Sequence, residues 1–262
     1  MATAIITGGD SGIGLEFSKA LAARHYDLVI ISVVRPSLEK AKPQLEADYG
    51  VKVATVLADL SDPTAIKQVQ ERIRRTRHLA YFVNCAGFAV HADILDDSPK
   101  ALALHSKAVQ VMALDILTFS VTAANQMLKD NAGHIINVAS TANWTFQGDY
   151  SAIKSYVVSF TGSLNLRLKD SNVTATAVCP SWMHTNFHKA ADLGEPDIPE
   201  WMYMKPAEVV RAALHAADEG KSLVVPTTRW KIITWLLGHG PLRWRRRFTS
   251  WYINTSNYQK RR

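Results

Sequence analysis

A tyrosine and a lysine four residues apart are the pair in this sequence best suited to proton transfer. Tyr150 and Lys154 stand at positions i and i+4, so a helix places both side chains on one face. A free phenol has a pKa of about 10 and is a poor acid or base at neutral pH. A nearby ammonium favours the phenolate and lowers that pKa toward the working range. Ser140 follows an apolar run, and its hydroxyl could donate to a substrate oxygen that gains charge.

A glycine-rich turn near the N-terminus has the composition of a site for a pyrophosphate. The segment 7–14 reads TGGDSGIG, follows an apolar run and leads into a helical pattern. Glycines permit a sharp turn and a close approach of the backbone, while the helix N-terminus attracts negative charge. We therefore interpret the turn as a dinucleotide site, although many glycine-rich turns serve only packing. The expected cofactor contacts are Thr7, Gly8, Asp10, Ser11, Gly12, Ile13 and Gly14.

The end of the second expected strand indicates which dinucleotide is bound. Segment 32–35 reads SVVR and holds no carboxylate for the ribose hydroxyls. Without that acid a 2′-phosphate is not repelled, and Arg35 could pair with it, which favours NADP while leaving NAD possible. The alternative is that Arg35 is a solvated surface residue. Further cofactor contacts are expected from residues that follow the third and fourth strands, namely Asp59, Leu60, Asn84, Ala86 and Gly87.

Apolar runs without internal alternation are spaced by helical patterns along most of the chain, which predicts a parallel sheet covered on both faces. The expected strands are 3–7, 28–32, 51–57, 79–84, 134–138, 173–179 and 223–225. The expected helices are 13–23, 37–48, 64–76, two long ones within 98–129 and 148–169, and 206–219. The fold class is therefore α/β, a doubly wound parallel sheet of Rossmann type with helices on both faces, in a single domain.

Large apolar side chains gather between the last two expected strands. We place a substrate loop at about 186–205 within a domain of residues 1–228 and treat 229–262 as a tail. These side chains either pack a lid or line a hydrophobic pocket on the cofactor side, and we favour the pocket. That choice indicates a lipophilic ketone or alcohol as substrate. The residues concerned are Trp182, Phe187, Trp201, Met202, Tyr203 and Met204.

Several motifs in the same order resemble the short-chain dehydrogenase/reductase family, in its classical type. They are the glycine turn 7–14, the segment Asn84-Cys85-Ala86-Gly87, Ser140 and the Tyr150–Lys154 pair, and the resemblance covers roughly residues 2–226. It implies a Rossmann-type fold and a proton relay that ends in the Tyr–Lys pair. It also implies homodimers or homotetramers built on the two long helices.

The chain departs from that family at several positions. Gln110 stands where many members carry an asparagine that helps to hold a relay water. The interval from Ser140 to Tyr150 is shorter than usual, which leaves Thr141 as a second candidate for the serine's role. The sequence has Pro180-Ser181 in place of the usual Pro-Gly. Tyr150, Lys154, Pro180 and Thr185, the last matching the residue that contacts the nicotinamide amide, complete the expected cofactor contacts.

The net charge of +7 is concentrated at the C-terminus. Residues 221–262 contain ten Lys or Arg and no Asp or Glu, whereas the other 220 residues have a net charge of −3. Tryptophan beside arginine is typical of an anchor at an anionic lipid interface. Peripheral membrane association and a capping or oligomer-contact role both stay open, and nucleic acid is not expected because no binding module is present. The tail holds four of the seven tryptophans, Trp230, Trp235, Trp244 and Trp251.

Other features limit the classes of function. Cys85 and Cys179 are too few for a disulfide framework, and free thiols fit a reducing cytoplasm. No basic region precedes the apolar start, so no signal peptide is expected, and no run approaches the length of a membrane span. His184 and His188 have helical spacing but no third ligand, so no metal is expected. The predicted location is cytoplasmic, with contact to a membrane left open.

The sequence therefore predicts an oxidoreductase that reduces a hydrophobic ketone or oxidises the secondary alcohol. Hydride from the nicotinamide would reach the carbonyl carbon while Tyr150 protonates the oxygen, and Lys154 would also bond the nicotinamide ribose. One alternative is an NADP-binding sensor or scaffold of the same fold with little turnover, which Gln110 and the short Ser140–Tyr150 interval favour. Another is a reductase of lipid-linked acyl or polyprenyl substrates at a membrane surface.

Overall fold

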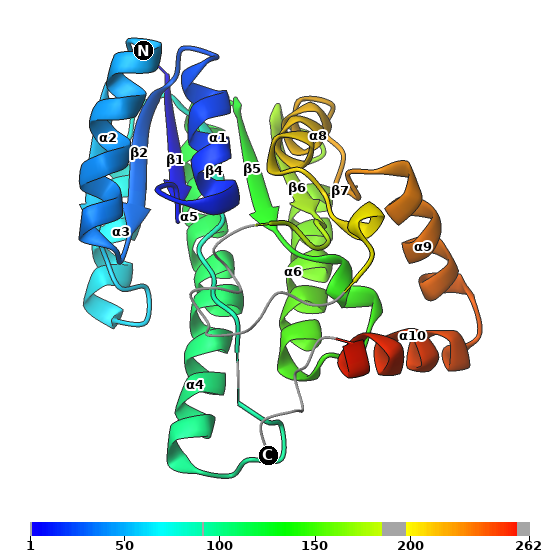
Figure 1. The fold of residues 1–262 in the computed structure, drawn as a ribbon. Coiled ribbons are helices and arrows are strands. Elements are labelled where there is room, and N and C mark those ends of the chain that lie inside the picture. Colours follow the sequence, from blue (N-terminus) through cyan, green and yellow to red (C-terminus); the bar gives the residue numbers. More distant parts are fainter. Residues whose placement is uncertain (1, 91, 185–197, 256–262) are drawn as a thin grey trace.

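A seven-stranded parallel sheet forms the centre of the protein (Figure 1). The computed structural model describes residues 2–90, 92–184 and 198–255. The strand order is β3-β2-β1-β4-β5-β6-β7, so the chain winds outward from β1 in both directions, as predicted for a doubly wound fold. The strands are β1 (Thr3–Thr7), β2 (Asp27–Ser32), β3 (Val53–Leu57), β4 (Leu79–Asn84), β5 (Gly133–Val138), β6 (Val173–Val178) and β7 (Leu223–Val224).

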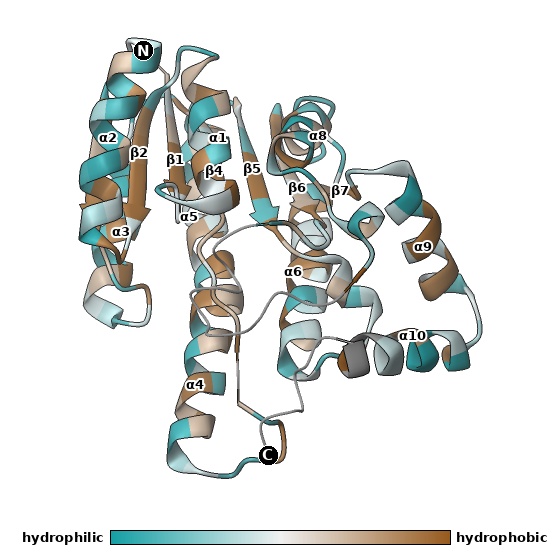
Figure 2. Ribbon diagram, viewed as in Figure 1, coloured by the Kyte–Doolittle hydropathy of each residue, from teal (hydrophilic) through white to brown (hydrophobic). Residues whose placement is uncertain are grey.

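The central strands are apolar on both faces because helices cover both. In β1, Ile5 and Ile6 are each fully buried but belong to different hydrophobic clusters, one on each side of the sheet. Ile5 pairs with Val29 of β2 and Phe82 of β4, which join the same cluster as Ile5. Figure 2 shows hydrophobic stretches along strands such as β2 and β5, and hydrophilic residues on the outer side of helices such as α2.

Two helical layers flank the sheet. On one face α1 packs against α2 and α8; on the other α3 packs against α5 and α4 against α6. Short 3₁₀ turns, η2 (Thr141–Trp144) and η3 (Glu200–Met202), lie in the connections. The helices are α1 (Gly12–Ala22), α2 (Arg35–Tyr49), α3 (Pro63–Arg75), α4 (Pro99–Val109), α5 (Asp115–Asp130), α6 (Gly148–Arg167), α8 (Pro206–Asp218), α9 (Thr228–His239) and α10 (Leu242–Thr255).

The long helical segment before β5 corrects one sequence-based expectation. Within the described residues, the helical segment Pro99–Asp130 has the length and hydropathy of a membrane span, although no such run was expected. Within its most apolar window, 61% is buried inside the protein, as for a core helix. A π-helical turn, η1 (Gln110–Leu114), joins α4 to α5 within this segment. Such turns insert one residue into a helix and often occur at functional sites.

The tail forms helices that the sequence did not predict. Helix α9 begins at Thr228, at the expected boundary between domain and tail, and packs against η2. Trp230 of α9 is 1% exposed, joins the hydrophobic cluster of the sheet, and donates its indole N–H to the Met202 carbonyl at 3.0 Å. The beginning of the tail is therefore part of the folded body.

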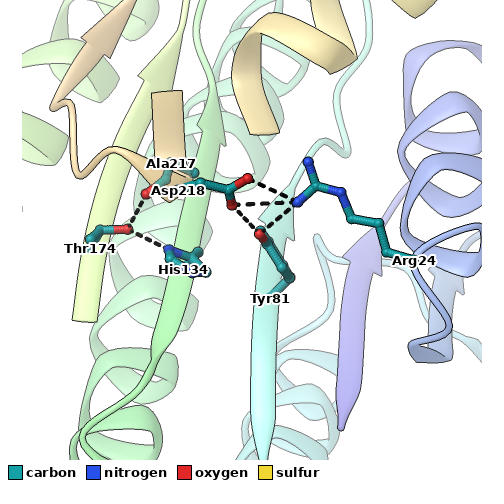
Figure 3. Close-up of polar contacts among 6 residues, drawn as sticks. All are labelled: Arg24, Tyr81, His134, Thr174, Ala217 and Asp218. Atoms are coloured by element: carbon teal, nitrogen blue, oxygen red, sulfur yellow. Dashed lines mark hydrogen bonds and ion pairs between the residues drawn. The ribbon is translucent and has the colours of Figure 1, made fainter. Parts of the chain in front are cut away.

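A polar cluster around the buried Tyr81 joins the ends of α1 and α8 to the amino-terminal edge of the sheet (Figure 3). The Arg24 guanidinium donates to the Tyr81 hydroxyl and pairs with Asp218, both at 3.0 Å, and Tyr81 also donates to Asp218. Burial raises the pKa of Tyr81, so its phenol stays a neutral donor. His134 bonds Thr174 at 2.9 Å beside it. This cluster is structural, because it lies at the edge opposite the strand ends that carry the candidate site.

Candidate active site

The turn after β1 has a conformation that requires glycine. Gly8 and Gly12 have φ values of +67° and +50°, in the left-handed region. A Cβ on Gly14 would lie 1.9 Å from the Gly8 carbonyl oxygen, so only glycine fits there. The Gly8 N–H bonds the Ile31 carbonyl at 2.7 Å, which holds the turn against the end of β2. The result is a concave backbone surface at the carboxyl edge of the sheet.

Hydrogen bonds fix this turn against the end of β4. The Thr7 hydroxyl accepts from the N–H groups of Cys85 and Ala86 at 3.0 and 3.1 Å. On the other side, the Ser18 hydroxyl donates to the Gly9 carbonyl at 2.8 Å. Thr7, expected as a cofactor contact, therefore has a structural role, since it joins the glycine turn to the segment that holds Ala86 and Gly87.

The N-terminus of α1 points out of the glycine turn. The N-cap residue Ser11 makes no side-chain capping bond, and the first turn of this eleven-residue helix holds no acidic residue. Ser11 and Gly12 are exposed, Ile13 is half-buried and Asp10 is buried. Backbone N–H groups at such an end are unsatisfied within the helix and attract an anion. Together with the cradle that a Cβ would fill, this end fits the pyrophosphate of a dinucleotide.

The residues after β2 and β3 lie beside the turn with different environments. Arg35 is exposed and is the first residue of α2. The sequence pattern predicted that this helix begins at residue 37. Asp59 is exposed, accepts from the Ser61 N–H at 2.9 Å and pairs with Lys107 at 3.2 Å. The bonds from Ser61 and the Lys107 ammonium lower the pKa of Asp59. Leu60 is buried in the core, so only its backbone is available to a cofactor.

Tyr150 and Lys154 share one face of α6, as predicted. The Lys154 ammonium lies 5.6 Å from the centroid of the Tyr150 ring and donates to the Val138 carbonyl at 2.9 Å. Lys154 is only 6% exposed, and burial lowers its pKa to about 8. Tyr150 is half-buried. The Lys154 ammonium is thus held near the Tyr150 ring by the carbonyl of Val138, the last residue of β5.

Ser140 lies at the end of β5 as the N-cap of η2. Its hydroxyl accepts from the Ala142 N–H at 3.1 Å and the residue is half-buried. Thr141, the second candidate, is 7% exposed, and its N–H bonds the carbonyl of the buried Pro180 at 2.9 Å. The greater exposure favours Ser140 as the hydroxyl that a substrate could reach.

Two thiols flank Lys154. Cys85 directly follows β4 and Cys179 directly follows β6, and desolvation raises the pKa of each thiol to about 12. Strand β5 lies between these strands, so the two residues are separated by two strand spacings, about 9.5 Å. A disulfide needs Cα atoms within about 7 Å. Both thiols therefore pack as neutral apolar groups around the ammonium.

Gln110 is at the first position of the π-helical turn η1 and bonds a residue that sequence reasoning missed. Its amide donates to Asp115 at 2.7 Å. Asp115 is 1% exposed, and burial raises its pKa to about 6. The Gln110 amide is thus paired with a buried carboxylate, and its part in a proton relay stays a prediction. The available signal was an acid within the apolar stretch 111–119.

A buried hydrogen-bond network beneath the site includes residues that the sequence did not point to. The Asn84 amide donates to Asn137 at 2.8 Å and to Ser120 at 3.0 Å, and the Asn137 amide donates to Thr161 at 3.0 Å. These side chains connect β4, β5, α5 and α6. Asn84, expected to contact cofactor, therefore has its amide in a buried network. An asparagine inside the buried strand 133–138 was the signal for it.

An apolar groove lies in the C-terminal part of the protein. It has a volume of about 400 Å³ between η3 and the two tail helices. Its lining includes Trp201 and Met202 of the expected substrate loop, whereas Met204 is buried in the core. Thr185, Phe187 and His188 lie outside the described residues. The groove is lined by Pro199, Trp201, Met202, Ile233, Leu236, Leu237, Trp244, Phe248 and Trp251.

Metal chemistry has no visible basis in the described part of the chain. No group of three His, Cys, Asp or Glu side chains there is arranged to hold an ion. His184 instead stacks on Tyr203 at 3.9 Å and contacts Glu200 at 3.1 Å. The fold and site together define a Rossmann-type protein with a Tyr–Lys pair beside a phosphate-binding turn.

Comparison with known proteins identifies the family. A family model described as short chain dehydrogenase matches residues 2–195. The 2-dehydro-3-deoxy-D-gluconate 5-dehydrogenase of Bacillus subtilis is 32% identical over 188 residues, which cover 70% of this chain and 71% of that protein. The D-beta-hydroxybutyrate dehydrogenase of Cupriavidus necator is 31% identical over 190 residues, with 70% and 71% covered. The chain belongs to the short-chain dehydrogenase/reductase family of oxidoreductases, as the motifs predicted.

A solved structure agrees with this assignment. A short-chain dehydrogenase from Sphingobium yanoikuyae, in complex with NADPH, matches with a TM-score of 0.80 and 25% identity. The match covers 89% of this chain and 92% of that one. Residues 196–262 lie beyond the family model, so the groove and the tail helices are features that the family match does not describe.

Proposed function

We propose that this chain is an NADP-preferring oxidoreductase acting on a hydrophobic ketone or the corresponding secondary alcohol. The observation that carries the proposal is the buried Lys154 ammonium, 5.6 Å from the Tyr150 ring, at the carboxyl edge that also holds the glycine cradle. The two curated relatives described above are named dehydrogenases, and the Sphingobium relative binds NADPH. These names support the reaction class for this chain.

Different segments at the carboxyl edge of the sheet would bind different parts of the cofactor. The glycine turn and the α1 N-terminus would hold the pyrophosphate, and the backbone of Ala86 and Gly87 would line the nicotinamide half. When bound, NADPH would supply the hydride that reduces the carbonyl carbon. Lys154, placed beside that cleft, would bond the nicotinamide ribose.

The proton chemistry belongs to the protein. In the reductive direction Tyr150 donates its phenol proton to the carbonyl oxygen, while Ser140 donates a hydrogen bond to the same oxygen. Lys154 is protonated at neutral pH because its pKa of about 8 lies above 7. Its ammonium stabilises the phenolate that Tyr150 becomes after the transfer. The phenol is reprotonated before the next turnover.

A panel of ketones tests the substrate class. Oxidation of NADPH should show kcat/KM at least about tenfold higher for ketones with long alkyl or ring substituents than for small polar ones, because one buried methylene contributes about 0.8 kcal/mol. Equal kcat/KM across the panel would refute the hydrophobic pocket. An NADP-binding sensor or scaffold is the second candidate, favoured by the Gln110–Asp115 pair, and it predicts NADPH binding without turnover of any ketone.

Arg35 is predicted to set the preference for NADP. The exposed guanidinium at the start of α2 is available to a 2′-phosphate, and an aspartate would repel that group. Arg35→Asp should raise the KM for NADPH about tenfold or more and lower the KM for NADH, because losing one charge-assisted bond costs about 1.5–3 kcal/mol. Steady-state kinetics with both cofactors measure this. Unchanged KM values would exclude Arg35 from the phosphate site, and Arg77→Asp, on the opposite edge, serves as a control.

We also propose that the chain forms a homodimer or homotetramer. Apolar side chains along the end of η1 and α5 are between 37% and 45% exposed at spacings of three, four and seven residues, which places them in one stripe. Burial of such a stripe against a second copy is the usual explanation for exposed apolar area of this kind. The stripe consists of Leu114, Leu117, Val121 and Leu128.

The tail is proposed to contact an anionic membrane surface from the cytoplasmic side. Trp235, Trp244 and Trp251 are 60%, 44% and 38% exposed, beside exposed arginines of α10, in a tail that lacks acidic residues. Aromatic rings and positive charge together suit the interface of an anionic bilayer. The groove between these helices would then open near the lipid that carries a hydrophobic substrate.

Binding to vesicles tests this contact. Replacing the exposed Arg243, Arg246 and Arg247 together by glutamine should weaken sedimentation with phosphatidylserine vesicles by about 100-fold, since each basic residue contributes about 1 kcal/mol. The same replacement at the exposed Arg72, Arg74 and Arg75 of α3 removes equal charge elsewhere and should have a smaller effect. Equal loss in both variants, or no binding by the unmodified protein, contradicts the proposal.

A further inference from the structure

The connection between β5 and α6 determines the relative placement of the two hydroxyls of the site. Ser140 lies at its start and Tyr150 follows its end, so residues 141–147 set the separation of their side chains. The Ser151 hydroxyl donates to the Ala142 carbonyl at 2.8 Å and accepts from the Gln147 N–H at 2.9 Å. These bonds tie the two ends of the connection to α6.

The C-terminal helix α10 holds residues 144–146 of the connection. The Arg245 Nε of α10 donates to the Trp144 carbonyl at 3.0 Å. The Thr249 hydroxyl accepts from the Phe146 N–H at 3.1 Å, and Thr249 is 4% exposed. Two backbone groups of the connection thus find their partners about a hundred residues away in sequence.

Packing adds to these two hydrogen bonds. The Arg245 guanidinium carbon lies 4.6 Å from the centroid of the Phe146 ring, within the range of a cation–π contact. On the neighbouring helix α9, a Cβ on Gly238 would lie 3.2 Å from the Trp144 indole nitrogen, so α9 and the connection pack closely. In Figure 1, α10 runs beside the N-terminal end of α6.

We propose that Arg245 and Thr249 are positioning residues of the active site. They hold residues 144–146 in the conformation that places Ser140 and Tyr150 on the same carbonyl oxygen. The short Ser140–Tyr150 connection is thus supported by a helix from the tail in addition to hydrogen bonds among its own residues. The proposal rests on the proposed function for its effect on turnover, whereas its structural part does not depend on turnover.

Residue-resolved hydrogen exchange together with kinetics tests this inference. Thr249→Val removes the acceptor with little change in shape, and Arg245→Gln removes the bond and the stacked guanidinium. Each should accelerate exchange of the Phe146 amide at least about tenfold and leave the core amides of β1 unchanged. Each should also lower kcat about tenfold with an unchanged KM for NADPH, since small misplacement of reacting groups reduces rate strongly.

Matched controls separate positioning from loss of charge or of stability. Lys231→Gln removes the same charge from an exposed position of the neighbouring tail helix α9, and Ser250→Ala removes a hydroxyl next to Thr249; both should match the unmodified protein. Faster exchange of Phe146 with an unchanged kcat would overturn the inference, and so would a lower kcat without local exchange or a parallel rise in β1. Hydrogen exchange is measured without substrate. If the protein reduced no ketone, the proposed function would be refuted, but exchange of the Phe146 amide would still test whether Arg245 and Thr249 hold the connection.

Discussion

Replacing Tyr150 by phenylalanine is expected to lower kcat for ketone reduction by about 10² to 10⁴-fold, the usual contribution of a positioned general acid. The phenylalanine ring keeps the contact with the Lys154 ammonium but has no proton to give to the carbonyl oxygen. Binding of NADPH should be nearly unchanged, because the phosphate cradle lies on another element. Stopped-flow or steady-state oxidation of NADPH measures the rate, and quenching of tryptophan fluorescence measures the binding.

Helix α6 provides the matched control for this substitution. Tyr156 is on the same helix, is 37% exposed and stacks on Phe160 at 6.1 Å, away from the lysine. Tyr156→Phe should therefore retain the kcat of the unmodified protein. If Tyr150→Phe turned over ketones as fast as Tyr156→Phe, Tyr150 would not be the proton donor, and the mechanism proposed above would be wrong.

Replacing Lys154 by methionine is expected to abolish most activity while stabilising the protein without cofactor. Burial lowers the pKa of Lys154 from 10.5 to about 8, so the folded state binds the proton more weakly than the unfolded state does. At pH 7 the ammonium is charged in both states, and the shift corresponds to a cost of up to about 3 kcal/mol. Methionine fills the same volume without that cost, although it loses the bond to the Val138 carbonyl.

The dependence on pH identifies the cause of this stabilisation. Between about pH 8 and 10.5 the folded protein has released the proton and the unfolded chain still holds it, so the stability of the unmodified protein rises with pH. The advantage of Lys154→Met should therefore shrink across that interval. Urea unfolding at pH 7 and pH 10 measures it, with the exposed Lys169→Met as control. A variant less stable than the unmodified protein at pH 7 would show that Lys154 bears no desolvation cost.

The sequence predicted the sheet because its strands carry their own signal. Segments such as 3–7 and 79–84 are apolar on both faces, which a parallel sheet between two helical layers requires, and their bounds are those of the structure. The Tyr150–Lys154 pair and the glycine turn were equally predictable, since helical spacing and positive φ are local properties. Arg35 was harder to place. Helix α2 begins at Arg35, with Pro36 in its first turn, which is two residues before the start that the apolar pattern predicted.

Features that depend on partners distant in sequence could not be predicted. Helix α10 has Trp244, Phe248 and Trp251 at helical spacing, but its position depends on bonds from Arg245 and Thr249 to a segment near residue 145. The pairing of Gln110 with Asp115 requires the extra residue of the π-helical turn. Asn137 was recognisable only as a polar residue in a buried strand, and its partners follow from the packing of two helices.

Isotope transfer tests most directly whether hydride passes from the cofactor to the ketone. NADPH carrying deuterium at nicotinamide C4, on one face or the other in separate assays, is incubated with the protein and the best ketone of the panel. We expect one of the two labelled cofactors to deliver its deuterium to the carbinol carbon of the product alcohol, as mass spectrometry would show. Bound NADPH with no labelled alcohol from either cofactor would contradict it and favour a sensor or scaffold of this fold.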